Sequence, residues 1–220
     1  MNNKVLMFLL LIFSLLSFAQ TANAQFTGQL STAENMRKGR MMYGGFLGIY
    51  DDISPAVFGQ VRRGFGLDID AGARFGFISI DAGRDDDETG VLVGGDAKFR
   101  ILDNQTGDAF DLSAGPALEA AITSDFSIFT VGGNLIGSMK FISQSGLIIT
   151  PYGRFSLRFQ NVSWDNDKFD RGLDDNSDSS LEFSVSLGSA FTVSDEVHLL
   201  GEVQLADDFL GFIAGINYGG

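Results

Sequence analysis

Strict alternation of apolar and polar residues over Leu67–Ser79 constrains the fold of this chain more than any other feature. Positions 67, 69, 71, 73, 75 and 77 are apolar, whereas the even positions from 68 to 76 hold aspartate, glycine or arginine. A period of two places the two sets on opposite faces of a β-strand. The segment also has the length of about 9–11 residues that a tilted strand needs to cross a bilayer. It therefore predicts a strand with one oily face and one charged face.

Similar strands recur along the whole chain after Arg40. The clearest copies cover 91–101, 147–159 and 181–193, and each carries phenylalanine among its apolar residues. We predict an all-β fold, a closed antiparallel up-and-down transmembrane β-barrel of ten strands. Eight strands are the alternative if the weakly alternating pair 42–50 and 56–63 does not cross the membrane. A soluble β-sandwich also alternates, but phenylalanine on nearly every oily face, opposite charged polar faces, favours the membrane barrel.

The first 24 residues have the features of a secretory signal peptide. Lys4 precedes the apolar run Val5–Phe18, and a small-residue cleavage site ends at Ala24. The apolar run is shorter than the roughly 20 residues of a membrane helix. We therefore expect export through the Sec pathway and a mature chain of 220 − 24 = 196 residues. We interpret residues 25–39 as a periplasmic N-terminal segment with room for a short helix, and residues 40–220 as the outer-membrane barrel domain.

The lengths of the connections between the predicted strands support this topology. Counted from a periplasmic N-terminus, the odd connections include two long acidic segments, 81–90 and 160–180. The even connections are all short, at 64–66, 103–108, 142–146 and 194–196. Outer-membrane barrels have short periplasmic turns and longer external loops. An even number of strands also returns the C-terminus to the periplasm.

Composition excludes several classes of function. The chain has no cysteine, which excludes disulfides, thiol chemistry and a lipid-modified N-terminal cysteine. The formal net charge of −13 becomes −14 when Lys4 leaves with the signal peptide. So acidic a chain argues against a nucleic-acid partner, which would favour a basic patch.

Charged residues on the polar faces are expected to point into the barrel lumen. A barrel of this size is narrow and largely filled by side chains, so a lumen packed with salt bridges is the simpler interpretation. A hydrated pathway for a small solute is the alternative. The predicted lumen charge network consists of Asp70, Arg74, Asp96, Arg100, Asp111, Glu119, Arg154, Arg158 and Glu182.

Symmetric turns would set the partners within this network. Arg74 would face Asp96, and Arg100 would face Asp70 on one side and Asp111 on the other. By the same reasoning Arg158 would face Glu182, whereas Glu119 has no obvious partner.

Acidic residues gather in the odd-numbered connections, including six aspartates within 160–180. The simpler interpretation is a solvated acidic surface. The functional one is weak divalent-cation binding that bridges to lipopolysaccharide phosphates through hard oxygen ligands. The sequence Asp165-Asn166-Asp167 is similar to the start of a Ca²⁺ loop but lacks the glycine and glutamate of an EF-hand. We therefore predict no cofactor and no fixed metal site beyond such weak cation binding.

From about Arg40 onward the chain resembles the small bacterial outer-membrane β-barrel superfamily, the barrels of the OmpA, OmpX and OmpW type. The last predicted strand, Leu210–Tyr218, alternates and ends in an aromatic residue as members of that superfamily often do, although two glycines follow Tyr218. The resemblance implies a bacterial outer-membrane location and contact with outer-membrane lipid and lipopolysaccharide. It also implies a monomer, helped during biogenesis by periplasmic chaperones and the barrel-assembly machinery.

These features favour a non-enzymatic barrel that serves envelope structure or surface interaction through its acidic loops. A narrow passive channel for small solutes or ions is the alternative. An outer-membrane enzyme would need a clustered external site. His198, the only histidine, falls instead near a short periplasmic turn, where we expect it to form a hydrogen bond in the lumen.

Overall fold

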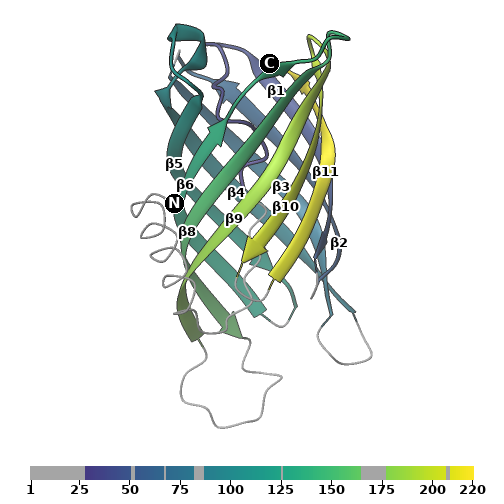
Figure 1. Ribbon diagram of the computed structural model, residues 1–220. Coiled ribbons are helices and arrows are strands. Elements are labelled where there is room, and N and C mark those ends of the chain that lie inside the picture. Colours follow the sequence, from purple (N-terminus) through teal and green to yellow (C-terminus); the bar gives the residue numbers. More distant parts are fainter. Residues whose placement is uncertain are drawn as a thin grey trace, which may run out of the picture.

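The computed structural model describes residues 28–50, 53–66, 68–81, 87–124, 126–164, 177–206 and 209–220, which form one antiparallel sheet rolled into a barrel (Figure 1). Beside the long strands lie a two-residue strand, β7 (Phe141–Ile142), and a short 3₁₀ helix, η1 (Asn104–Thr106). The predicted fold class is confirmed. The long strands are β1 (Met41–Tyr50), β2 (Ile53–Gly64), β3 (Ile69–Asp81), β4 (Asp87–Leu102), β5 (Asp111–Ile122), β6 (Phe126–Ser138), β8 (Ile148–Trp164), β9 (Ser177–Ser194), β10 (Val197–Ala206) and β11 (Phe209–Gly219).

The sheet closes on itself through two pairings. Strands β1 to β6 are neighbours in chain order, as are β8 to β11. Strand β1 pairs with β11, from Met42 opposite Gly219 to Tyr50 opposite Gly211, and β6 pairs with β8. Every long strand therefore has two hydrogen-bonded neighbours, and the described wall has no free edge. Because β1 and β2 are full members of this wall, the predicted number of ten strands is correct and the alternative of eight is wrong.

Side chains alternate between the outside and the inside of the barrel along each strand. Phe75 and Phe77 of β3 are 53% and 52% exposed, whereas Asp70 and Arg74 are 0% and 2% exposed. Such an apolar outer surface is the lipid-facing side of a transmembrane barrel. Each long strand contributes exposed apolar residues to it, among them Leu47, Val57, Phe75, Val93, Leu118, Phe129, Phe155, Leu187, Leu199 and Phe212. Separately, no helix in the described part of the chain is long and apolar enough to cross a bilayer.

Strands β1 and β2 alternate weakly in sequence because apolar residues occupy part of their inner face as well as their outer face. Leu47 and Ile49 point outward, whereas Phe46 and Tyr50 are buried inside. Phe46 stacks on Phe58 with ring centroids 5.6 Å apart and planes 15° apart. These rings belong to an apolar cluster inside the barrel that also includes Ala56, Ile78, Leu92, Ala121 and Ile213. The ambiguous sequence pattern thus reflects lipid on one side and an internal core on the other.

Four short connections and the C-terminus lie together at one end of the barrel, which we call the short-turn end (Figure 1). At the opposite end β8 and β9 are longer than predicted, and Gln160 pairs with Ser180 and Ser163 with Ser177. The predicted loop 160–180 is therefore wrong in its bounds. Its centre, 165–176, lies outside the described residues, as do the signal peptide and residues 82–86 of segment 81–90.

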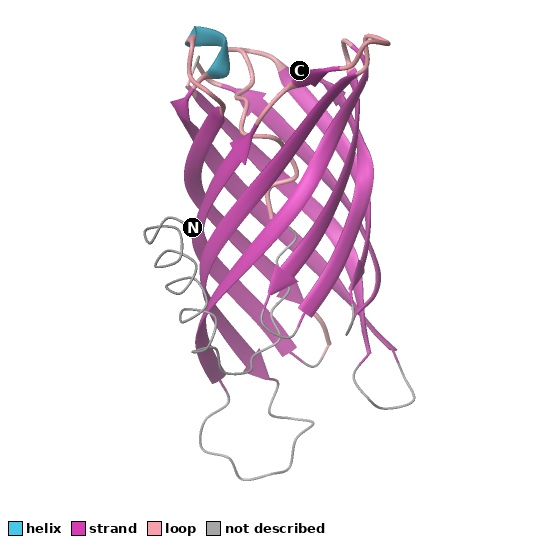
Figure 2. Cartoon of the chain, in the orientation of Figure 1, coloured by secondary structure: helices cyan, strands magenta, loops and turns pink. Residues whose placement is uncertain are grey.

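Residues 28–38, which we call the lumenal segment, lie inside the barrel (Figure 2). Leu30 and Ala33 are completely buried there, and none of these residues is helical. We expected residues 25–39 to precede the barrel; the structure instead places the described part of them within its lumen. Gly64 allows the segment to leave at the short-turn end, because a Cβ at this position would overlap the carbonyl oxygens of Arg37 and Met36.

Candidate functional site

A chain of alternating charges crosses the lumen from β2 to β5. Arg62 lies between two carboxylates, with Nη2 2.5 Å from Asp70 Oδ1 and Nη1 2.7 Å from Asp96 Oδ1. The second oxygen of Asp96 accepts a hydrogen bond from Arg74 Nη1 at 2.6 Å. Arg74 Nε lies 3.6 Å from Glu119 Oε2. All five side chains are buried, and their alternation gives each charge an opposite neighbour, as burial requires.

A second buried cluster lies on the other side of the lumen, on strands β8 to β10. Arg154 forms an ion pair with Glu202 and donates a hydrogen bond to Ser186 Oγ at 3.0 Å. The Glu202 carboxylate also accepts hydrogen bonds from Tyr152 Oη at 2.7 Å and from Gln204 Nε2 at 2.8 Å. The carboxylate is thus held by three different donors, which fixes its position in the lumen.

The lumenal segment is attached to the barrel chiefly through Lys98 of β4. Its ammonium donates to the carbonyl oxygens of Thr32 at 2.8 Å and Glu34 at 2.7 Å, and lies 3.3 Å from Ser31 Oγ. The same ammonium is 3.4 Å from Asp70 Oδ2. Lys98 therefore joins the first charge cluster to the segment that crosses the lumen.

Other strands hold the same segment by its backbone. Asp70 accepts a hydrogen bond from the Met36 amide at 3.0 Å. Because these partners come from strands distributed around the barrel, the segment is fixed across the lumen rather than along one wall. The remaining contacts are Arg154 Nη1 to Gln29 O at 2.6 Å, Gln60 Nε2 to Leu30 O at 2.9 Å, Asn217 Nδ2 to Leu30 O at 3.4 Å, and the Ala33 amide to Ser138 Oγ at 3.1 Å.

The structure brings some predicted partners together and separates others. Arg74 does contact Asp96, but Arg100 contacts neither Asp70 nor Asp111. The cause is the register of β3 and β4, in which Gly72 lies opposite Asp96. Symmetric turns place the β4 partners of Arg74 and Asp70 two residues further along, and in the register of β4 and β5 Arg100 lies opposite Ser113 instead of Asp111.

This shift gives Arg100 different partners at the short-turn end. Arg100 Nη2 is 2.7 Å from Asp68 Oδ1, and Nη1 is 2.6 Å from Asp103 Oδ2. Asp111 instead accepts a hydrogen bond from the Asn104 amide at 2.9 Å, beside helix η1. Both Arg100 and Asp111 therefore belong to the rim rather than to the central network.

Of the remaining predicted residues, Arg158 and Glu119 lie deeper in the barrel, and His198 lies near its end. Arg158 of β8 lies opposite Glu182 of β9 in the sheet register, as expected. Glu119, which had no obvious partner in sequence, lies beside Arg74 as described above. His198 of β10 lies near the short-turn end with Nδ1 3.1 Å from Thr192 Oγ1. In the described part of the chain, no group of three or more His, Cys, Asp or Glu side chains is arranged to hold a metal ion.

Sequence reasoning missed Arg62, Lys98 and Glu202 as members of the central network. Arg62 was assigned to the end of a strand, next to Arg63 and Gly64. In the structure β2 continues to Gly64, so the alternation of the strand turns Arg62 inward and Arg63 outward. The predicted strand 56–63 already contained Gln60 and Arg62, which share one face, but the apolar residues Ala56 and Phe58 on that same face hid its polar character.

Comparisons with known proteins add little beyond this geometry. No family model and no curated protein matches the chain. Solved structures with a similar fold were found, but their sequence identities and TM-scores are too low to support any conclusion about function. They include the N-terminal β-barrel domain of Pseudomonas aeruginosa OprF (10% identity, TM-score 0.39, 84% of this chain and 100% of that chain), the KdgM porin (8%, 0.39, 80% and 98%) and the outer membrane protein AlkL (8%, 0.38, 92% and 97%).

Proposed function

We propose that this chain is a non-enzymatic integral barrel of the bacterial outer membrane whose lumen is closed to solutes. Its role is structural or adhesive, exerted through the two surfaces that the barrel presents at its ends. Support for the membrane comes from the continuous apolar outer surface and the closed sheet, which leaves no unpaired strand edge in lipid. The signal-peptide pattern of residues 1–24 supports export.

The main support for a closed lumen is the attachment of the lumenal segment to the barrel. Side chains from β2, β4, β6, β8 and β11 bind its backbone directly. A barrel of about eight to ten strands has an interior only wide enough for its own side chains. A peptide fixed across such an interior, with the buried charge clusters on both sides of it, supports a lumen that is closed to solutes at this level.

Conductance of the refolded protein in planar bilayers tests this proposal. We expect no channel openings from protein that is inserted in the bilayer and that runs as a heat-modifiable band on gels. A variant without residues 25–36 is the matched control, because it removes the segment while keeping the complete wall. Openings in this variant alone support closure by the segment. Steady, salt-dependent openings in the unaltered chain would refute the closed barrel.

A narrow passive channel is the second candidate, and one observation favours it. The side chain of Gln160 is 1% exposed, yet neither its Oε1 nor its Nε2 has a hydrogen-bond partner among the described residues. Buried amide groups normally have hydrogen-bond partners, so we expect water to bind Gln160 in this part of the lumen. Openings of the unaltered chain that change in ion selectivity on Gln160→Glu would establish this function.

For the surface role we propose that the acidic connections act at the external side, either as a solvated surface or as weak divalent-cation ligands toward lipopolysaccharide phosphates. The support is the sequence, in which aspartate and glutamate gather in the odd-numbered connections. Binding of the refolded barrel to lipopolysaccharide vesicles, measured with Ca²⁺ and again with a chelator, tests the cation. Equal binding in both conditions would exclude bridging by the cation and leave the solvated acidic surface as the interpretation.

A further inference from the structure

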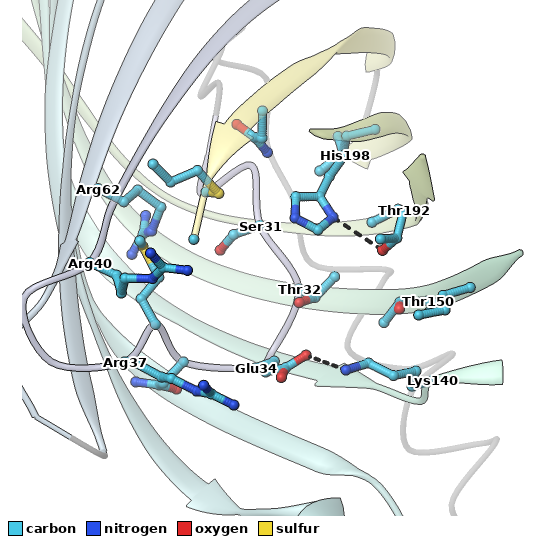
Figure 3. Close-up of a pocket in the computed structure, with 18 of the residues that line it drawn as sticks. Ser31, Thr32, Glu34, Arg37, Arg40, Arg62, Lys140, Thr150, Thr192 and His198 are labelled. Carbon is cyan, nitrogen blue, oxygen red and sulfur yellow. Dashed lines mark hydrogen bonds and ion pairs between the residues drawn. The ribbon is translucent and has the colours of Figure 1, made fainter. Parts of the chain in front are cut away.

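A pocket of about 540 Å³ opens at the short-turn end of the barrel (Figure 3). The lumenal segment forms one side of it through Ser31, Thr32 and Met36. Strands β8 and β9 form the other side, where Thr150 and Thr192 line it. The pocket exists because the lumenal segment crosses the lumen inside the rim of the barrel, leaving a cup that is open to solvent at the short-turn end.

Positive charge enters this cup at the end of the lumenal segment. The guanidinium groups of Arg37 and Arg40 extend into it from the end of the lumenal segment, and the ring of His198 faces them from β10 (Figure 3). Neither Arg37 nor Arg40 forms a salt bridge with a described residue, although most other buried or rim cations do. Both arginines are exposed to solvent and available to a ligand.

The carboxylates around the cup are mostly engaged elsewhere. Glu34 binds Lys140 Nζ at 3.0 Å and accepts a hydrogen bond from Gln105 Nε2 at 2.9 Å. Arg62 and Lys98 also line the cup, and both are already paired with buried aspartates. The other acidic side chain in the lining is Asp195, so two arginines without a salt bridge face one acidic side chain, and Gly220 also lines the cup.

The rest of the lining is apolar or carries hydroxyl groups. Met36, Met42 and Leu200 contribute apolar surface, and the threonines of β8 and β9 contribute hydroxyls. A concave site with apolar walls and a few charged groups is the usual form of a small-molecule site. Guanidinium groups suit carboxylates and phosphates, whose planar or trigonal oxygens accept paired hydrogen bonds.

We propose that this cup binds a small organic anion, a carboxylate or phosphate joined to an apolar group. Arg37 and Arg40 bind the charged group, and Met36, Met42 and Leu200 contact the apolar part. The site goes beyond the proposed closed barrel and does not depend on it, because the cup opens to solvent whether or not the lumen conducts.

The four methionines at positions 36, 41, 42 and 139 make a built-in test by methyl NMR of the refolded protein. Met36 and Met42 line the cup, whereas Met41 and Met139 are exposed on the barrel exterior, each 39%. Phenyl phosphate and benzoate are the anionic probes, and benzyl alcohol is the neutral one. We expect saturable shifts at Met36 and Met42 with at least one anion, and none at the two outer methionines.

Substitutions then identify the charged contacts. Arg37→Gln and Arg40→Gln should each weaken the binding of the anion about tenfold, as the loss of a charged hydrogen bond does. Arg63→Gln is the matched control, because Arg63 is exposed near the same end, 5.9 Å from the Phe65 ring and outside the cup. It should leave the affinity unchanged.

Each outcome decides the question. Shifts with phenyl phosphate alone assign a phosphate ligand, shifts with benzoate alone assign a carboxylate, and either supports the proposal. Equal shifts with benzyl alcohol would show simple partition of an aromatic ring and overturn it. So would an equal loss of affinity in Arg63→Gln, or the absence of shifts at Met36 and Met42 with both anions.

Discussion

Replacing Lys98 by methionine should release the lumenal segment while leaving the barrel folded. Methionine keeps most of the length of the side chain but removes the ammonium, which donates to Thr32 O at 2.8 Å and to Glu34 O at 2.7 Å. Asp70 would keep its contact with Arg62 at 2.5 Å, so no buried carboxylate is left alone. The substitution therefore mainly lowers the free energy that attaches the segment to the barrel.

The size of this loss follows from the two hydrogen bonds. A hydrogen bond from a charged donor contributes about 1.5–3 kcal/mol, and two from one ammonium are not fully additive. We take about 3 kcal/mol for the attachment through Lys98. Since 1.4 kcal/mol is a factor of ten, the population of the released segment should rise on the order of 100-fold.

Thiol labelling measures this release, because the chain contains no cysteine of its own. Leu30→Cys places a single, smaller side chain at a position that is completely buried in the segment. When reclosing is faster than labelling, the rate of modification by a maleimide follows the released population. Lys98→Met should therefore raise that rate about 100-fold over the Leu30→Cys chain alone.

Lys140→Met is the matched control for this experiment. Lys140 also contacts the segment, 3.0 Å from Glu34, but both side chains are about one-third exposed. Such a pair contributes about 0–1 kcal/mol, so the labelling rate should change by less than about fivefold. Equal effects of Lys98→Met and Lys140→Met would refute the assignment of Lys98 as the main attachment. Labelling of Leu30→Cys at the rate of a free thiol would refute the burial of the segment.

Two further substitutions test the second charge cluster and the orientation of the inner face. Glu202→Gln should lower the free energy of unfolding by about 3 kcal/mol, because Arg154 would stay buried without its carboxylate. Urea titration of the heat-modifiable band measures this, and a loss below about 1 kcal/mol would contradict the pairing. Gly188→Ala should cost about 1–3 kcal/mol, because its Cβ would overlap the Tyr152 ring, whereas Gly201→Ala has open space and should be neutral. Similar urea midpoints for both alanine variants would contradict the inward position of Tyr152.

The faces of the strands could be predicted from the sequence because a barrel wall has only two environments. In β3 the parity of each position decides whether its side chain meets lipid or lumen, and parity is visible in the sequence. The partner across the hairpin depends on the geometry of the turn, and that geometry is not visible in the sequence. A shift of two residues between β3 and β4 kept Arg74 and Asp96 on the inner face but placed Asp70 opposite Lys98 instead of Arg100.

The lumenal segment could not be predicted in the same way. It has no period, because what the barrel binds is mainly its backbone rather than a pattern of side chains. The carbonyl oxygens of Leu30, Thr32 and Glu34 are acceptors that any residue would offer. The donors, among them Gln60 and Lys98, appear in sequence only as ordinary polar positions of amphipathic strands.

The attachment of the lumenal segment also sets an order for folding. Its partners lie between 30 residues away along the chain, at Gln60, and 187 residues away, at Asn217 of the last strand. Contacts of such wide sequence separation form slowly, because the long loops between them must close first. Leu30 cannot reach both partners until β1 has met β11 and the cylinder is complete. The part of the barrel nearest the N-terminus is thus among the last to reach its final position.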